Sequence, residues 1–121
     1  MIFYRDKQKY NRIEGYSYFL FLKIGYIQVD IIRQKAQINF FSVHRYFRKR
    51  GIGRTLINKT IPYIKETEVT ELYVFPHSYD CVSNKDISTE ELYNCYEKLG
   101  FKYTNDTPNK LKLGEEMVLK F

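Results

Sequence analysis

The chain has 121 residues, a length that fits one domain with one hydrophobic core. Hydrophobic residues make up 44% of it and charged residues 28%, a composition that excludes a disordered chain. Lysine and arginine exceed aspartate and glutamate by 20 − 14 = +6, which favours an anionic partner such as a nucleotide-bearing cofactor, a nucleic acid or an acidic protein.

The sequence shows no sign of export or of membrane insertion. Lys23 and Asp30 interrupt the longest apolar stretch, which is too short to span a bilayer. The N-terminal segment lacks the apolar region of a secretory signal. Cys81 and Cys95 have neither metal-ligand spacing nor the density of a disulfide scaffold. We therefore expect a cytoplasmic protein with reduced thiols, no metal and no membrane partner.

The N-terminal half predicts β-structure. Residues 16–23 and 26–33 are dense in Tyr, Phe, Ile and Val, which suit a pleated surface, and Gly25 is the predicted turn between them. A third strand is predicted over residues 37–43.

A helix is predicted next, over residues 52–65, because apolar residues recur there at helical spacing. Pro62 falls inside this segment and removes one backbone hydrogen bond, so we expect a kink. The sequence ELYVF then predicts another strand, which Pro76 stops.

The C-terminal part predicts one helix and two strands. Ser88 or Thr89 caps the helix, with Glu91 as the capping-box partner of Ser88, and Gly100 ends it. The last strands are expected at about 101–104 and 116–121. The whole chain, 1–121, is predicted to be a single domain of the α/β (α+β) class, with a mixed sheet and two main helices.

A basic, glycine-containing loop separates the strand that ends at Val43 from the predicted helix. A strand, such a loop and a helix N-terminus together form an anion site, because the first-turn amides have no helical partner. The segment lacks the pattern of a P-loop. A dinucleotide fingerprint requires a third glycine where this chain has Leu56.

The loop resembles the acetyl-CoA-binding loop of the GNAT acetyltransferases. That loop has Arg or Gln, two variable residues, Gly, one variable residue, and Gly or Ala, and it follows a strand that carries a Val. Here the matching residues are Arg48, Gly51 and Gly53, after Val43. Taken alone, so short a pattern is common by chance.

A second motif, in the order expected for the same family, strengthens the resemblance. The segment YEKLGFKYT is similar to the last helix-to-strand junction of GNAT proteins, through Tyr96, Lys98, Gly100 and Phe101. The resemblance covers about residues 16–121. It implies a mostly antiparallel GNAT-like sheet, shortened at the N-terminus, and acetyl-CoA as cosubstrate.

The resemblance also implies which residues bind the cofactor. The strand with Val43 would splay from its neighbour and offer backbone groups to the pantetheine arm, and the loop would hold the pyrophosphate. A Cβ at Gly51 or Gly53 would obstruct the phosphate. Solvated surface is the alternative role for each basic side chain. The implied cofactor-binding residues are Phe41, Ser42, Val43, Arg48, Lys49, Arg50, Gly51, Ile52, Gly53 and Arg54.

For catalysis, the family implies direct attack of an amine on the thioester. Tyr96 lies where family members place a Tyr near the sulfur, so it is the candidate general acid; the alternative is a core aromatic residue. The backbone N–H at or next to Val43 would meet the oxyanion. Gln37 stands where protein-lysine-acetylating members have a Glu, so their general base is missing. His77 is the candidate base.

Other features of the acceptor side depart from the family pattern. His44, Tyr79 and Asp80 are weaker candidates for the base. Ser78 replaces a common Asn, and the added loop up to Thr89 is expected to shape the acceptor pocket. Because the N-terminal part is short, the acceptor cleft is expected to be open or completed by a second subunit in a homodimer.

Three functions stay open from the sequence. The first is an acetyl-CoA-dependent N-acetyltransferase that acts on an amine of unknown identity. The second is a non-catalytic GNAT-like module that binds CoA or a protein. The third is nucleic-acid binding through the basic residues, which we do not expect to be the main function; the residues concerned are Arg45, Arg48, Lys49, Arg50 and Arg54, interleaved with Tyr46 and Phe47.

Overall fold

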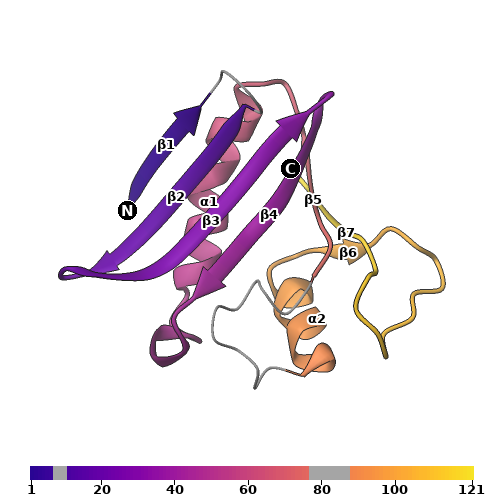
Figure 1. The fold of residues 1–121 in the computed structure, drawn as a ribbon. Helices are drawn as coiled ribbons and strands as arrows, with labels where there is room; N and C mark the ends of the chain where they lie inside the picture. The colour runs from indigo at the N-terminus through magenta and orange to yellow at the C-terminus, as the bar shows by residue number, and fades with distance from the viewer. Residues whose placement is uncertain (7–10, 77–87) are drawn as a thin grey trace.

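A computed structural model describes residues 1–6, 11–76 and 88–121 of the chain. These residues form one mixed, mostly antiparallel sheet of seven strands with two α-helices, which confirms the predicted fold class (Figure 1). The strands are β1 Ile2–Asp6, β2 Arg12–Phe19, β3 Leu22–Ile32, β4 Lys35–Val43, β5 Glu71–Val74, β6 Lys102–Tyr103 and β7 Met117–Lys120. The helices are α1 Ile52–Lys65 and α2 Thr89–Lys98, and a short 3₁₀ turn, η1, covers Arg45–Phe47.

The strand order is β1-β2-β3-β4-β5-β7-β6. Within the described chain, β4 and β5 form the one parallel pair, and α1 makes the crossover between them. Figure 1 shows α1 behind β2, β3 and β4, whose inward-facing residues pack against it. The main core contains Ile13, Ile27, Val29, Ile31, Ala36, Ile38, Phe41, Leu56, Ile57, Ile64, Val69, Leu72, Val74, Leu92, Tyr93, Tyr96, Phe101 and Met117.

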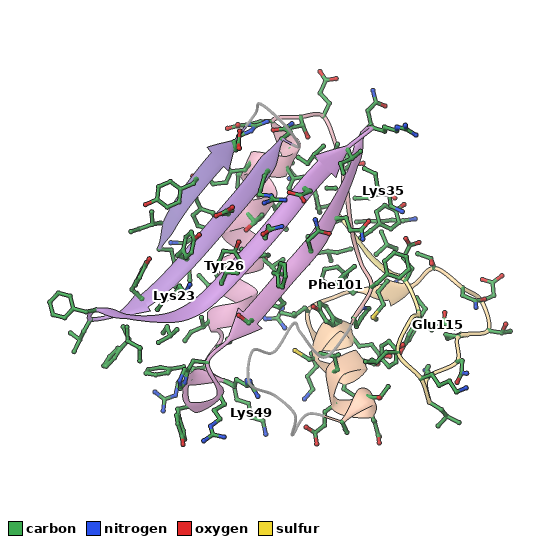
Figure 2. All side chains as sticks on the ribbon, in the orientation of Figure 1. Lys23, Tyr26, Lys35, Lys49, Phe101 and Glu115 are labelled. Carbon is green, nitrogen blue, oxygen red and sulfur yellow. The ribbon has the colours of Figure 1, made fainter. Side chains whose placement is uncertain are left out.

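The N-terminal segment forms a strand that the sequence analysis did not predict. β1 pairs antiparallel with β2, from Ile2 opposite Tyr16 to Asp6 opposite Arg12. Its two charged residues, Arg5 and Asp6, weaken the usual strand signal, and an edge strand tolerates such charges. No described helix covers the opposite face of the sheet, where Figure 2 shows Tyr26 and Lys23.

The predicted turn at Gly25 is wrong. The β2–β3 hairpin turns at Leu20 and Phe21, and Gly25 lies inside β3, opposite Ser17 on β2 and Val43 on β4. A glycine between two aromatic segments is a common turn signal. In this chain the missing side chain instead permits the close packing of α1.

Replacing Gly25 with Ala is expected to destabilise the fold by about 1–3 kcal/mol through overpacking. The new Cβ would lie 2.9 Å from Leu56 Cδ1 and 3.3 Å from Ile52 Cγ2, both on α1. Chemical denaturation measures the loss. If the clash with Leu56 is the cause, adding Leu56→Val should cost less in the Gly25→Ala background than in the parent chain; additive losses would contradict this explanation.

Both helices have the predicted bounds to within two residues. α1 continues through Pro62, so the helix does not end early there. Ser88 is the N-cap of α2, since its Oγ accepts a hydrogen bond of 3.1 Å from the Glu91 amide, as predicted. Neither helix is long and apolar enough to cross a membrane, and the same holds for all the described residues.

Candidate functional site

The strands β4 and β5 separate towards the end of β4. Their parallel pairing covers three residues of β4, Ala36 to Ile38, and stops there. β4 itself continues to Val43 and stays paired with β3 on its other side. The residues of β4 after Ile38 therefore have one edge that β5 does not cover, which is the splay expected from the sequence.

The backbone of Val43 faces this open edge. The His44 amide donates a hydrogen bond of 2.7 Å to the Ile24 carbonyl on β3. Because hydrogen-bonding direction alternates along an antiparallel strand, the N–H and C=O of Val43 point the other way, towards the side of β5. Arg48 Nε donates to this Val43 carbonyl at 3.0 Å. The open edge thus offers the Val43 amide, with an arginine fixed beside it.

Arg48 also has a nitrogen that is ready for an anion. Its Nη2 atom is buried and has no hydrogen-bond partner among the described residues. A buried guanidinium nitrogen without a partner is costly, whereas a phosphate oxygen would satisfy it. This orphaned donor is the sharpest sign in the described chain that the loop is built around an anionic ligand.

The N-terminus of α1 supplies further donors. Gly51 is the N-cap, in the left-handed region with φ 80°, and makes no side-chain capping bond. A Cβ built at Gly51 has no atom within 4 Å, so the space above the first turn is open. The unpaired first-turn amides and the helix dipole therefore face a space into which an anion can enter.

Gly53 is required for a reason that the sequence did not show. A Cβ at this position would lie 3.0 Å from Cζ of Phe41, whose ring comes from β4. The prediction assigned the glycine to phosphate access alone. In the fold it also lets α1 approach the β4 side chain that lines the site.

One cleft joins these features. It has a volume of about 710 Å³ and lies between the end of β4, the N-terminus of α1 and one side of α2. Of the ten predicted cofactor-binding residues, nine line the cleft and Arg50 does not. Its lining is Phe41, Ser42, Val43, Phe47, Arg48, Lys49, Gly51, Ile52, Gly53, Arg54, Glu91, Leu92, Asn94, Cys95, Tyr96, Lys98 and Leu99.

The charge of the cleft is mostly positive. Arg48, Lys49, Arg54 and Lys98 contribute four cations, and Glu91 is the one carboxylate in the lining. Arg54 also ties the two helices together, because its Nη2 donates to the Lys98 carbonyl at 2.6 Å. On the α2 side of the cleft, the sequence analysis named Tyr96 as a site residue but missed the others, which have no phosphate-binding pattern of their own; they are Glu91, Leu92, Asn94, Cys95, Lys98 and Leu99.

Two tyrosines on α2 have different surroundings. Tyr93 donates its hydroxyl to the Lys112 carbonyl at 2.6 Å and accepts from the Glu115 amide at 3.3 Å, so it braces the C-terminal loop. Tyr96 lines the cleft, with its buried ring 6.0 Å from that of Phe41 and 5.4 Å from that of Phe101. Tyr96 therefore has both a core role and access to the site.

The general base has no clear candidate among the described residues. Gln37 on β4 lies opposite Asp30 on β3 in the sheet register. The buried Asp30 carboxylate is not a free base, because its Oδ1 lies 2.7 Å from Arg12 Nε and its Oδ2 accepts a hydrogen bond from Asn39. The predicted base His77 lies outside the described residues, as do Ser78, Tyr79, Asp80 and Cys81. His44 accepts a hydrogen bond from the Tyr46 amide and is not part of the cleft lining.

The tyrosines of the open sheet face are poor bases. A hydrogen bond to Glu14 raises the pKa of Tyr16, and burial raises the pKa of Tyr26. Both hydroxyls therefore stay protonated at neutral pH and act as hydrogen-bond donors.

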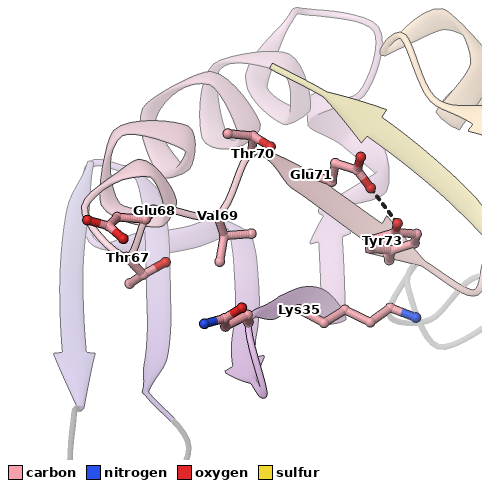
Figure 3. Close-up of a pocket in the computed structure, with 8 residues that line it drawn as sticks. Lys35, Thr67, Glu68, Val69, Thr70, Glu71 and Tyr73 are labelled. Carbon is pink, nitrogen blue, oxygen red and sulfur yellow. Dashed lines mark hydrogen bonds between the residues drawn. The ribbon is translucent and has the colours of Figure 1, made fainter.

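A second, smaller cavity lies at the other end of the sheet (Figure 3). It has a volume of about 380 Å³ and a mostly polar lining that includes Lys35, Glu68 and the hydrogen-bonded pair Glu71 and Tyr73. Lys35 and Val43 are at opposite ends of β4, about 26 Å apart at the usual rise per residue. This cavity is therefore separate from the cleft.

No metal site is found in the part of the chain that the structure describes, since no three His, Cys, Asp or Glu residues are grouped so as to hold an ion.

A family model matches most of the chain. The model of the acetyltransferase (GNAT) domain matches residues 14–103, which include the whole loop and both helices. The comparison with curated proteins found no significant match.

Many solved structures share the fold, at low identity. The PaiA N-acetyltransferase from Thermoplasma acidophilum, in complex with coenzyme A, is 21% identical over 91% of this chain, with a TM-score of 0.63. A streptothricin acetyltransferase from Bacillus anthracis, in complex with acetyl coenzyme A, is 21% identical over 94%, with a TM-score of 0.70. The anti-CRISPR protein AcrVA5 is 20% identical over 88%, with a TM-score of 0.64.

These neighbours differ in size. The present chain spans 60% of the length of PaiA and 65% of that of the streptothricin acetyltransferase, but 98% of that of AcrVA5.

Proposed function

The chain belongs to the GNAT acetyltransferase family, and from this premise we propose that it is an N-acetyltransferase that transfers the acetyl group of acetyl-CoA to an amine. The observation that carries the proposal is the single cleft in which the open edge of β4, the N-terminus of α1 and Tyr96 meet. The proposal keeps the cytoplasmic location and the reduced thiols that the sequence leads us to expect.

The binding roles follow from the donors in the cleft. The first-turn amides of α1 and the free Nη2 of Arg48 would hold the pyrophosphate of acetyl-CoA, and Lys49 and Arg54 would add positive charge. The open edge of β4 would pair with the pantetheine amides as an added strand does. Coenzyme A in the PaiA structure supports acetyl-CoA as the cosubstrate.

The chemical roles follow from what acyl transfer requires. The neutral amine nitrogen attacks the thioester carbon, and the Val43 amide stabilises the oxygen that becomes negative. The carbon–sulfur bond then breaks, and the Tyr96 hydroxyl gives its proton to the departing thiolate. The proton lost by the amine passes to a base, for which His77, directly or through water, is our candidate.

The proposal is tested by thiol release. Purified protein with acetyl-CoA is offered a panel of amines (polyamines, an aminoglycoside, a lysine peptide and an N-terminal amine), and free CoA is measured with a thiol reagent. Acceptor-dependent release, with the acetylated product identified by mass, supports the proposal. Binding of acetyl-CoA without release for any amine would contradict it and favour the second candidate.

The second candidate is a non-catalytic GNAT-like module that binds CoA or a protein. It is favoured by Gln37, which stands where protein-lysine-acetylating members of the family have a Glu, and by the hydrogen bonds that hold the neighbouring Asp30 carboxylate to Arg12 and Asn39. Tyr96 in the cleft lining favours the enzyme instead.

Nucleic acid as the main partner has less support. Three of the five basic residues of the loop segment, Arg48, Lys49 and Arg54, line the cleft, so they are committed to a small anionic ligand in our proposal. A competition experiment separates the CoA site from a nucleic-acid site. If the basic residues bind CoA, CoA should displace a bound oligonucleotide, and binding of the oligonucleotide that is independent of CoA would favour a nucleic-acid site. A homodimer stays part of the proposal, since the sheet face beside β4 is uncovered and a second subunit would complete an acceptor site there.

Replacing Arg48 with Gln is expected to weaken CoA binding by about 10- to 100-fold, because a charge-assisted hydrogen bond contributes about 1.5–3 kcal/mol. The buried Nη2 of Arg48 has no hydrogen-bond partner among the described residues, so it is available to a phosphate oxygen. Calorimetric titration with CoA measures the change, and Arg33→Gln at the β3–β4 turn is the control with the same loss of charge. Equal weakening in both variants would mean that net charge alone matters.

A further inference from the structure

The tip of the β2–β3 hairpin is exposed and apolar. Its four consecutive residues are Phe19, Leu20, Phe21 and Leu22, and their exposed fractions run from 50% for Leu22 to 101% for Phe21. Single exposed apolar side chains are ordinary on a protein surface, but a contiguous group marks an interaction site. Figure 1 shows this hairpin extending beyond the end of α1, away from the body of the fold.

The turn itself has a residue that folding does not favour. Leu20 has a φ of 56°, in the left-handed region. Gly or Asn is usual at such a position, because a Cβ there is strained. The chain keeps a large apolar side chain where a smaller polar residue would suit the turn better. A role in binding, outside the folding of the hairpin, would explain why position 20 is a leucine.

Aromatic and basic residues of η1 lie next to the hairpin. The ring of Phe47 is 5.4 Å from that of Phe19, and the guanidinium of Arg50 lies 5.5 Å from the centre of the Phe47 ring. Tyr46 is exposed, and Arg45 lies over its ring. None of Tyr46, Arg45 and Arg50 lines the cofactor cleft.

Lys23 adds a cation on the hairpin itself. It follows the tip on β3, and Figure 2 shows it beside the hairpin. Its ammonium lies 5.4 Å from the centre of the Tyr16 ring, on the open face of the sheet. The apolar tip is thus accompanied by Lys23, Arg45 and Arg50.

From this arrangement we infer that the hairpin tip, residues 19–22, inserts into the interface of an anionic lipid surface, with Lys23, Arg45 and Arg50 contacting the headgroups. Apolar insertion combined with basic residues is the pair of signals that stable interfacial binding requires. A convex tip suits a fluid interface, which needs no complementary groove. A second copy fits less well, because a symmetric contact would bring these cations close to themselves.

This inference revises the expectation of no membrane partner, which considered a spanning segment and a secretory signal but not binding at the membrane interface. It does not rest on the acetyltransferase proposal. Interfacial binding needs neither a spanning helix nor a long apolar run.

Vesicle sedimentation tests the inference. The full chain is mixed with phosphatidylcholine vesicles with or without phosphatidylserine, and we expect binding that requires phosphatidylserine. Leu20→Gly combined with Phe21→Ser should lower the partition coefficient by at least about tenfold. The matched control is Leu111→Ser, since Leu111 is 89% exposed on a distant loop. Lys23→Gln with Arg45→Gln should lower it by about 30-fold, and Lys59→Gln with Lys120→Gln should not.

Misfolding does not confound this test. Glycine at position 20 relieves the left-handed strain, so the tip variant should unfold at the parent's temperature or above it. Its CoA-induced thermal shift should also be unchanged. Two results would overturn the inference directly: the parent chain does not bind phosphatidylserine vesicles, or the tip variant binds them equally well. A dimer that only the tip variant loses would also overturn it, because the tip would then be a protein contact.

Discussion

Replacing Tyr96 with Phe is expected to lower kcat for amine acetylation by about 10²- to 10⁴-fold, the usual contribution of a general acid. The variant removes one oxygen and keeps the ring, which packs against Phe41 and Phe101. Folding and CoA binding should therefore change little. Steady-state thiol release measures kcat, and thermal shift with CoA measures binding in the same sample.

Tyr93 on the same helix is the matched control. Its hydroxyl braces Lys112 and Glu115 through their backbone groups, so Tyr93→Phe should lower stability by about 1–3 kcal/mol and leave kcat unchanged. If Tyr96→Phe loses stability but keeps its full kcat, Tyr96 is a core residue and the general acid must be sought elsewhere. Opposite effects of the two variants separate the catalytic role from the structural one.

Replacing Gly53 with Val is expected to abolish the stabilisation of the fold by CoA. For the parent chain, a ligand at a hundred times its Kd adds about 2.7 kcal/mol to the free energy of unfolding, a shift of several degrees in a domain of this size. In the variant, the Cβ alone would lie 3.0 Å from Phe41 Cζ and 3.6 Å from Val43 Cγ2, and the two methyl groups would add volume beside these residues, which line the cleft.

The measurement is the difference in Tm with and without CoA, taken for each variant against its own ligand-free state. This comparison cancels the loss of stability that overpacking causes in the ligand-free variant, which we expect to be about 1–3 kcal/mol. Asn58→Val is the control, because it adds the same branched side chain to an exposed position of α1. A full CoA shift in Gly53→Val would mean that the cofactor does not use the α1 N-terminus.

The parts of the site that could be predicted are those that follow from short stretches of chain. The bounds of α1 come from its apolar spacing, and the cap of α2 from Ser88 and Glu91. The phosphate loop was recognisable because its glycines and the helix after them are contiguous in sequence. Gly51 of this loop adopts the left-handed conformation, which glycine permits because it has no Cβ.

The misses concern contacts between distant segments. Gly25 was taken for a turn because its partner, Leu56 on α1, is far away in sequence. The strand β1 was missed because its alternation is broken by charges that an edge tolerates. Arg50 was predicted to bind the cofactor together with Arg48, but Arg48 lines the cleft and donates to the Val43 carbonyl, whereas Arg50 is not in the lining.

By itself, the sequence determined the class of the fold, the phosphate-binding loop and the family to which the chain is similar, because these depend on local residue patterns and on their order along the chain. The tertiary structure decided which side chains meet. It brought α2 across to close the cleft, joined the two helices through Arg54 and the Lys98 carbonyl, and left Tyr93 outside the lining, bound to the C-terminal loop. Those outcomes depend on sheet register and helix packing, which join residues far apart in the chain and leave no pattern in any one segment.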